Sequence, residues 1–511
     1  MIRPGFVWLL AALALAGYVV TLNRVPIEFG DGPFYASIAR SLQLGRAGVP
    51  SLLKQGPTSV DHLRFYGPVY FSTLAAWFTI AGCSSLAFRI FCFASALLAA
   101  AGAVAVSWSL GGGRTRQAWA MLLVLLSPEL GFAATFGRMD PLAVGLEMFA
   151  LAVFVHGVTF ERRPWLHGAA SGAVLAAAAL STPRTFPFVL GFAIALVTVL
   201  PRGTDRGRRH AWRQALVCVA TAAALWLAWT IVSSGGPRAW FRMMAYIATH
   251  EDTDVALLRA HRTWLFVWWQ AVTPGFAIVG AALVAQRLRG RASYTVAASF
   301  ALATTWIALV ATWTLFEDTF LFESLAILPL FSVVLAIPVV SSDRSRARMA
   351  VVGAALVCFF VGVRVAKQVR AVVTWSGRDP APLTAFVKTH VPAGSEVLGP
   401  DEDYFFAVEE SGSRYLIATQ RSASDWARWM AAIDGTPAAA PNPVLADYLL
   451  WPRDLPPPAL SCLAATARAS YDPPPMDFPR LSRLVRDDPR AQYAATTLYA
   501  LTPTCANGRV D

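Results

Sequence analysis

The stretch FVWLLAALALAGYVVTL, residues 6–22, decides the fold class, because it carries no charge and is almost entirely apolar. A helix of about 20 such residues crosses the roughly 30 Å of hydrocarbon in a bilayer. The residues that follow, Leu22, Asn23 and Arg24, lack the small side chains of a signal-peptide cleavage site. We therefore interpret the stretch as a retained membrane span rather than a cleaved leader.

Ten further apolar runs follow in the 511-residue chain. The predicted spans are residues 6–22, 86–110, 117–134, 141–160, 165–182, 185–200, 212–232, 263–285, 292–313, 322–340 and 348–365. Hydrophobic residues make up 56% of the chain and charged residues 14%, where soluble domains carry about 25% charged residues. The sequence therefore predicts a polytopic α-helical membrane protein of about eleven transmembrane helices.

Arginines set the predicted orientation, because cytoplasmic loops carry an excess of basic residues. With the N-terminus inside, the proposed inner segments hold sixteen arginines and three acidic residues. The arginines are Arg3, Arg114, Arg116, Arg162, Arg163, Arg202, Arg206, Arg208, Arg209, Arg213, Arg287, Arg289, Arg291, Arg344, Arg346 and Arg348. The richness in arginine and alanine is typical of a GC-rich bacterial genome. We predict a bacterial inner-membrane protein with a cytoplasmic N-terminus and a periplasmic C-terminal domain.

The first outer loop, residues 23–85, is long enough to contain helices of its own. One predicted helix has an apolar face of Phe34, Tyr35, Ile38 and Leu42 and a polar face of Ser37, Arg40, Ser41 and Gln43. This division predicts a helix that lies in the membrane interface. Residues 67–82 form a second apolar stretch that is too short to span comfortably. Residues 233–262 contain a similar interfacial helix.

After about residue 366 the sequence changes character, since charged residues and prolines become frequent and apolar runs become short. The predicted strands are 396–398, 415–418, 448–451 and 496–500, and the predicted helices are 383–390 and 423–433. We expect two domains: a transmembrane domain, residues 1–365, and a small extracytoplasmic α/β domain, residues 366–511. Cys462 and Cys505 fall in the second domain, where an oxidising compartment permits the disulfide that we expect between them.

Acidic residues at membrane depth are few, and each needs an explanation because charge is expensive there. Asp31 follows the first span and Asp140 precedes the fourth, so the predicted topology puts both at the outer boundary. Either aspartate could instead cap a proline-initiated helix. Glu147 lies two helical turns beyond Asp140 on the same face, where a cap does not explain it and a polar cavity does.

Three arginines, Arg64, Arg138 and Arg184, fall at the same predicted boundary. A guanidinium can bind phosphate through two parallel hydrogen bonds, and the alternative is snorkelling to lipid headgroups. A divalent metal is a further alternative at His250, Glu251, Asp252, Asp254 and His261. Their spacing matches no strong ligand motif, and a solvated surface explains them more simply.

Five short motifs occur in order along the first 200 residues. They are EFGDGPFY at 28–35, FYGPVY at 65–70, LAFR at 86–89, RMDP at 138–141 and TPR at 182–184. In this order and topology the chain resembles the GT-C glycosyltransferases that use polyprenyl-phosphate sugars, such as the protein O-mannosyltransferases and the lipid A aminoarabinose transferase. The rest of the chain resembles that family in layout, including the outer C-terminal domain.

The resemblance implies an enzyme that transfers a sugar from a polyprenyl-phosphate donor to a lipid, glycan or protein acceptor at the outer membrane face, with inversion. It implies that Asp31 and Asp140 are catalytic residues and that Arg184 binds the donor phosphate. The further residues expected to contact substrate or line its cavity are Glu28, Tyr35, Tyr66 and Glu147.

The chain also departs from the family pattern. Gly32 follows Asp31 where the family has glutamate, and Tyr66 and Gly67 stand where the family has a basic residue before Pro-Pro. Arg64 or Arg138 is therefore expected to supply the phosphate contact instead.

Two other classes of function stay open. A transporter or flippase for lipid-linked sugars should show internal repeats and broken helices, and the sequence shows neither clearly. A non-catalytic envelope assembly protein could have the same topology. Nucleic acid is not an expected partner, because the basic residues behind the net charge of +12 are confined to short loops between apolar runs.

Overall fold

The computed structural model describes residues 4–24, 31–45, 63–64, 66–126, 134, 137–160, 163–185, 188–189, 192–193, 205–250, 361–362, 365–366, 368–400, 402–417, 446–455, 457, 463–475 and 493–503. The chain divides into two compact units. The first unit contains Met1–Val20, Arg64–Tyr70 and Cys92–Ala366, and the second contains Thr21–Leu63, Phe71–Phe91 and Lys367–Asp511. Most of the first outer loop is therefore grouped with the C-terminal segment.

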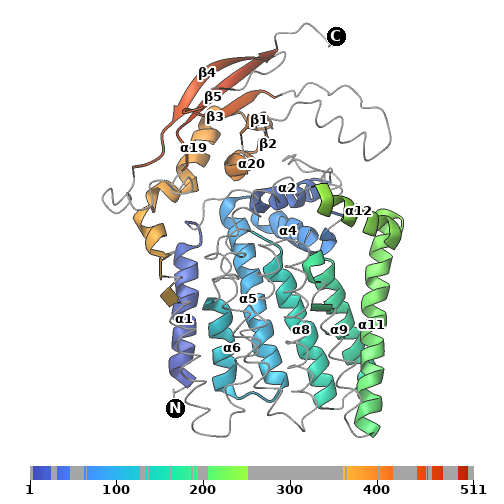
Figure 1. Ribbon diagram of the computed structural model, residues 1–511. Helices are drawn as coiled ribbons and strands as arrows, with labels where there is room; N and C mark the ends of the chain where they lie inside the picture. Colours follow the sequence, from blue (N-terminus) through green and yellow to red (C-terminus); the bar gives the residue numbers. More distant parts are fainter. Residues whose placement is uncertain are drawn as a thin grey trace. The chain divides into compact units, whose positions relative to one another are not determined.

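The first unit is built from helices, and Figure 1 shows the longest of them running side by side. Its helices are α1 (Pro4–Thr21), α5 (Ser85–Ser109), α6 (Arg114–Leu126), α8 (Asp140–Thr159), α9 (Pro164–Ala179), η1 (Pro183–Thr185), α11 (Asp205–Ser234) and α12 (Pro237–His250). The first residues of α5 belong to the second unit. Helix α12 lies within the segment 233–262, where an interfacial helix was predicted.

Three of the described helices are long and apolar enough to cross a membrane: Ser85–Ser109, Asp140–Thr159 and Arg209–Ser234. They coincide with the predicted spans 86–110, 141–160 and 212–232, which are confirmed as long apolar helices. Two shorter apolar helices occur at Gly5–Thr21 and Pro68–Ala81. Spans 263–285, 292–313 and 322–340, and most of 185–200 and 348–365, lie outside the described residues. The total of eleven therefore stays a prediction.

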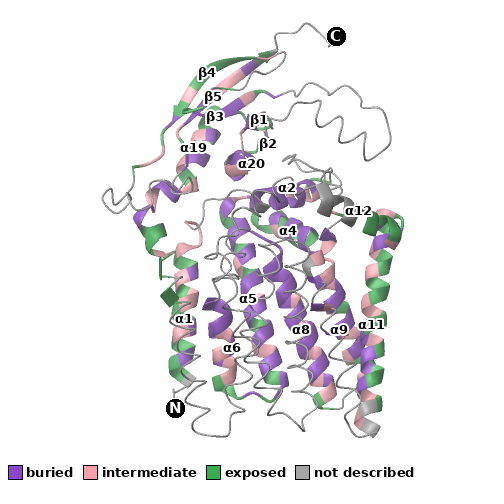
Figure 2. Cartoon of the chain, in the orientation of Figure 1, coloured by how far each residue is buried: buried purple, intermediate pink, exposed green. Residues whose placement is uncertain are grey.

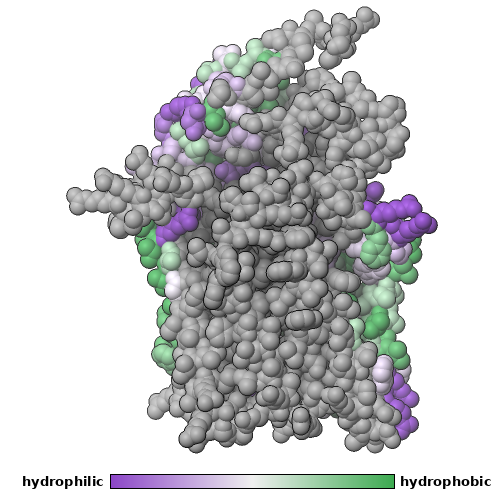
Figure 3. All heavy atoms as spheres, in the orientation of Figure 1, coloured by the Kyte–Doolittle hydropathy of each residue, from purple (hydrophilic) through white to green (hydrophobic). Residues whose placement is uncertain are grey.

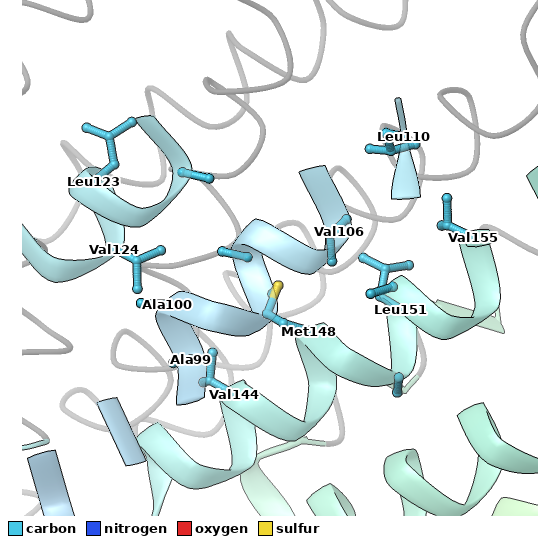
Figure 4. Packing of buried hydrophobic residues seen from close by; sticks show 14 of the residues in the cluster. Ala99, Ala100, Val106, Leu110, Leu123, Val124, Val144, Met148, Leu151 and Val155 are labelled. Carbon is cyan, nitrogen blue, oxygen red and sulfur yellow. The ribbon is translucent and has the colours of Figure 1, made fainter. Parts of the chain in front are cut away.

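The interior of the first unit is mostly apolar, and small residues let its helices approach closely. Figure 4 shows Ala99 of α5 beside Val144 of α8, and Ala100 of α5 beside Val124 of α6. A methyl group added to Gly102 of α5 would lie 2.6 Å from Met148 Cβ. Helices α5 and α8 therefore meet at a distance that only glycine permits, as is common between membrane helices.

Helices α9 and α11 also pack closely, through two glycines four residues apart. Added methyl groups on Gly168 and Gly172 would both overlap backbone atoms of α11. Polar side chains fasten the same bundle: Ser171 Oγ donates to Ala150 O at 2.8 Å, and Gln214 Nε2 donates to Phe154 O at 2.7 Å. These hydrogen bonds satisfy polar groups that lipid could not.

Helix α11 exposes apolar side chains along much of its length. Figure 2 shows α8 largely buried and α11 largely exposed, and Figure 3 shows hydrophobic residues on the exposed face of α11. The exposed side chains include Leu216, Val219, Ile231 and Val232, the last with 82% of its surface accessible. Such an apolar surface suits a helix that is solvated by lipid.

The second unit contains the predicted helix of the first loop, α2 (Asp31–Gln43), together with most of α4 (Pro68–Ala81). Phe34, Tyr35 and Ile38 are buried as expected. Ser37 and Ser41 of the polar face are buried as well. In the same unit α20 (Phe405–Glu410) and η4 (Glu402–Tyr404) of the C-terminal segment pack against α2.

The C-terminal segment forms a five-stranded mixed sheet with strand order β2-β1-β3-β5-β4. The strands are β1 (Glu396–Gly399), β2 (Arg414–Ile417), β3 (Tyr448–Pro452), β4 (Leu463–Tyr471) and β5 (Thr496–Pro503). Strands β2, β1 and β3 are parallel, whereas β5 is antiparallel to both β3 and β4. All four predicted strands are confirmed. Strand β4 was not predicted, because it is a mostly exposed edge strand of small and polar residues.

The predicted helix 383–390 is confirmed within α19 (Pro380–His390), which begins after the cap residue Asp379. The predicted helix 423–433 lies outside the described residues, as do Cys462 and Cys505. Along the chain, the described residues next to the two cysteines are Leu463 and Pro503, which are partners in the pairing of β4 with β5. The Cys462–Cys505 disulfide stays a prediction.

Candidate active site

The turn before α8 places a buried ion pair at the start of that helix. Gly137 has a φ of +73°, which turns the chain toward the helix, and Asp140 is the first helical residue. The cap position belongs to Met139, whose side chain makes no capping hydrogen bond. The carboxylate of Asp140 accepts a hydrogen bond from Arg138, with 3.0 Å between Nε and Oδ2. The structure therefore favours an ion pair over the capping interpretation of Asp140.

Both members of this pair are almost completely buried, with 5% of the Arg138 side chain and 1% of the Asp140 side chain accessible. Burying two charges is unfavourable unless each is well compensated. The N-terminus of α8 compensates Asp140 in part, because the helix dipole is positive at that end. A charged pair kept at this cost is a functional candidate on physical grounds.

A segment of the first outer loop docks on this turn. Tyr70, in the first turn of α4, donates from its hydroxyl to Gly137 O at 2.8 Å. The backbone N–H of Val69 donates to Leu180 O at 3.0 Å. Tyr66, one of the predicted substrate residues, lies in the same segment and is also buried. Hydrogen bonds therefore join residues 66–70 both to the turn 137–140 and to the end of α9.

Gly67 allows this docking, and we expect Gly67→Ala to disrupt it. Gly67 has a φ of +95°, and a methyl group there would overlap the Leu180 backbone, 2.8 Å from its Cα. Strain of this kind costs roughly 1–3 kcal/mol before the overlap is added. The matched control is Gly82→Ala at the other end of α4, where φ is +79° and the added methyl group meets open space. Thermal unfolding in detergent should show a larger loss for Gly67→Ala, and equal losses would contradict close docking.

Arg184 lies in η1, a short helix that packs against both α8 and α9. Its neighbours Ser181, Thr182 and Thr185 are buried, and Thr185 Oγ1 donates to Thr182 O at 3.1 Å. The backbone of Arg184 is thus held next to the helix that begins at Asp140. The Arg184 side chain is outside the described part of the structure, so its phosphate contact stays a prediction.

Glu147 lies two turns along α8 from Asp140, and only 1% of it is accessible. Among the described residues, no hydrogen-bond partner of its Oε2 atom is found. A buried carboxyl oxygen without a partner is expensive and needs a reason. Glu147 therefore remains a candidate substrate residue, as the sequence predicted.

Asp31 begins α2 in the second unit, and Asp140 begins α8 in the first unit. That the two aspartates face one cavity stays a prediction.

Tyr35 is buried and packs edge-to-face on Phe71, with 6.1 Å between ring centroids. Glu28 lies outside the described residues.

Comparison with solved structures identifies the fold. The chain is similar to ArnT from Cupriavidus metallidurans bound to undecaprenyl phosphate, with a TM-score of 0.57, 14% identity and 98% of each chain covered. It is also similar to the oligosaccharyltransferase of Archaeoglobus fulgidus in a complex with Zn and sulfate. That match has a TM-score of 0.53 and 15% identity, and covers 87% of this chain and 68% of the other. Both are GT-C glycosyltransferases.

The chain has the GT-C glycosyltransferase fold. A mutant of the arabinofuranosyltransferase AftD from Mycobacteria matches 98% of this chain at 16% identity, with a TM-score of 0.51. This chain corresponds to 42% of the length of that protein. No protein-family model and no curated protein matches the sequence. At these identities the GT-C likeness concerns the fold, and the reaction must be argued from the site.

In this GT-C fold, the predicted arginines have different surroundings. Arg138 is buried in its ion pair, whereas Arg64 is exposed and its backbone oxygen accepts a hydrogen bond from Trp240 Nε1 at 3.2 Å. Within the described residues, no group of three or more His, Cys, Asp or Glu side chains could hold a metal ion. The acidic and histidine side chains of 250–261 are not among those described, so a divalent metal stays a prediction.

Sequence reasoning missed two features of this chain. The first is the hydrogen bond from Tyr70 to the turn before α8. Tyr70 belongs to the motif at 65–70, and a hydroxyl group two residues after Gly-Pro could have marked it as a candidate. The ion pair between Arg40 of α2 and Glu409 of α20 joins residues 369 positions apart. Nothing in the local sequence links those two residues.

Proposed function

We propose that this protein is a membrane glycosyltransferase that transfers one sugar from a polyprenyl-phosphate donor to an acceptor at the outer face of a bacterial inner membrane. The observation that carries the proposal is the buried Arg138–Asp140 pair at the start of α8 in a chain with the GT-C fold. A phosphate-bearing lipid substrate gives a reason for buried and clustered charge at such a position.

The proposed step is a single displacement. The acceptor hydroxyl oxygen bonds to the anomeric carbon of the sugar while the bond from that carbon to the phosphate oxygen breaks. Asp31 takes the hydroxyl proton as general base, a role that contributes about 10²–10⁴-fold in rate. The electron pair leaves with the phosphate, so the products are the glycosylated acceptor and polyprenyl phosphate. Attack opposite the leaving group inverts the anomeric configuration.

Negative charge grows on the phosphate as it leaves, and guanidinium groups stabilise such charge most effectively where water is excluded. Arg138, Arg184 and Arg64 are the proposed donors of this stabilisation. Asp140 would hold Arg138 in one orientation through their ion pair. The structure of ArnT bound to undecaprenyl phosphate supports a lipid phosphate as the class of ligand in this fold. The proposed orientation has the N-terminus in the cytoplasm and residues 366–511 in the periplasm.

The test has two steps. A strain lacking the gene should accumulate the unused polyprenyl-phosphate sugar, which mass spectrometry identifies. The purified protein in detergent should then convert that donor to polyprenyl phosphate when an envelope extract supplies the acceptor. Detergent micelles have no two sides, so a transporter or an assembly protein gives no product. Unchanged donor in this assay would contradict the proposed function.

A further inference from the structure

The second unit contains a partly buried ion pair between the first outer loop and the C-terminal segment. Arg40 of α2 and Glu409 of α20 lie 3.2 Å apart, between Nε and Oε2. The Glu409 side chain is 5% accessible and the Arg40 side chain 23%. An ion pair of this kind specifies geometry more than it adds stability, because desolvation offsets much of the attraction.

Each end of the pair is itself anchored. The second carboxylate oxygen of Glu409 accepts a hydrogen bond from the Tyr415 backbone N–H at 3.2 Å, at the start of β2. Arg40 also donates to Gln43 Oε1 at 2.7 Å, and Gln43 Nε2 donates to Phe78 O of α4 at 2.9 Å. A continuous series of hydrogen bonds therefore runs from the sheet through α20 and α2 to α4. Such a series restricts α2 far more than an isolated surface pair could.

Further contacts join the same parts of the second unit. Phe88 of α5 packs against Phe406 of α20, with ring centroids 5.1 Å apart. Arg24, just after α1, forms an ion pair with Asp379, and its guanidinium lies 5.1 Å from the Trp375 ring centroid. The C-terminal segment is therefore joined to the residues just after α1 and to the start of α5, in addition to α2.

We propose that Arg40 and Glu409 are positioning residues: the C-terminal segment holds α2, and with it Asp31 at the start of that helix, in the arrangement needed for sugar transfer. This inference rests on the proposed function. A displacement of about 1 Å in a reacting group can lower a rate about 10²-fold. Arg40 lies nine positions after Asp31 in the same helix, so releasing one end of α2 displaces the other.

The test compares Glu409→Gln with Glu410→Gln. Glu410 is the next residue, and its pair with Lys388 is 3.1 Å long but exposed, with accessibilities of 36% and 48%. We expect Glu409→Gln to lower kcat about 10²-fold with little change in the KM for the donor. Glu410→Gln should leave both within about 2-fold, because exposed pairs contribute little. Similar kcat values for the two variants would overturn the proposal.

A double-mutant cycle tests the pairing itself. Arg40→Gln should lower kcat to the level of Glu409→Gln, and the double variant should lose no more than either alone. Independent, multiplicative losses would overturn a shared role. If Glu409→Gln does not fold, Arg40→Lys replaces it, since lysine keeps the charge but cannot bond Glu409 and Gln43 through one fork. A kcat loss of about 10-fold is expected there, and wild-type kcat would overturn the proposal.

Cys83 supplies a readout that does not depend on activity. It is buried between α4 and α5; burial raises the pKa of its thiol, and the Glu409 carboxylate raises it further. Labelling with N-ethylmaleimide, mapped by mass spectrometry, should be faster at Cys83 in Arg40→Gln than in wild type. Loss of the Arg40 charge alone would slow the labelling, because that charge lowers the pKa of the thiol, so faster labelling reports exposure of Cys83. The labelling rates of Cys92 and Cys218, which are buried within α5 and α11, should be unchanged.

If wild type shows no transfer, the proposed function fails, and Cys83 labelling still shows whether the link between Arg40 and Glu409 holds α2.

A purely structural role makes a different prediction. In that case the loss of kcat in Glu409→Gln would equal the loss of folded protein, measured by size-exclusion chromatography and thermal unfolding. Under the positioning role, the folded fraction stays near that of Glu410→Gln while kcat falls. A loss of kcat that disappears when rates are expressed per folded molecule would overturn the proposal.

Discussion

Replacing Asp31 by asparagine is expected to lower kcat for sugar transfer by about 10²–10⁴-fold, while the protein folds and inserts normally. Asparagine has nearly the shape of aspartate and caps helices equally well, so α2 should still begin at residue 31. It cannot accept a proton from the acceptor hydroxyl, so the proposed chemistry is lost and the helix is kept. If Asp31 serves only as a cap, the variant should be fully active.

The measurement is conversion of donor to polyprenyl phosphate by purified protein, with folding checked by thermal unfolding. Asp454→Asn is the matched control, because Asp454 is exposed and the substitution removes the same charge. It should leave kcat unchanged. Full activity of Asp31→Asn toward a hydroxyl acceptor would remove the general-base role. An acceptor that attacks through an ionised phosphate needs no base, so the acceptor is identified before the result is interpreted.

Replacing Arg138 by methionine is expected to destabilise the first unit by about 3–5 kcal/mol, because the buried carboxylate of Asp140 loses its guanidinium partner. The double variant Arg138→Met with Asp140→Leu should recover much of that loss, since both charges of this pair are then removed together. Under the proposed mechanism, neither variant transfers sugar, because the phosphate contact is absent from both. In the double variant, stability should therefore recover while sugar transfer stays absent.

Thermal unfolding in detergent measures the first expectation, and donor conversion measures the second. Wild-type stability in Arg138→Met would contradict the burial of this ion pair. Wild-type activity in the double variant would show that the pair takes no part in the reaction. Recovered stability without recovered activity is the result that supports a functional role for Arg138 and Asp140.

The local features of this protein could be predicted from its sequence. Apolar runs at 86–110, 141–160 and 212–232 mark long helices, because length and hydrophobicity are properties of consecutive residues. The strands of the C-terminal segment were predicted for the same reason, except β4, whose small and polar residues lack the alternation of a half-buried strand. Asp140 was located correctly at the start of its helix, since Arg-x-Asp-Pro is a local helix-start signal.

What those residues contact depended on the tertiary structure. From the sequence, Asp140 could be a cap or a charged partner, and the fold decides for the ion pair with Arg138. Ser37 and Ser41 belong to the polar face of α2 in the sequence, yet both are buried in the structure, where elements more than 350 positions away pack against the helix. The sequence by itself determined which segments are helices, which are strands and where charge enters an apolar chain. The structure decided how α2 packs and that Arg40 meets Glu409, because such contacts depend on how distant segments fill space together.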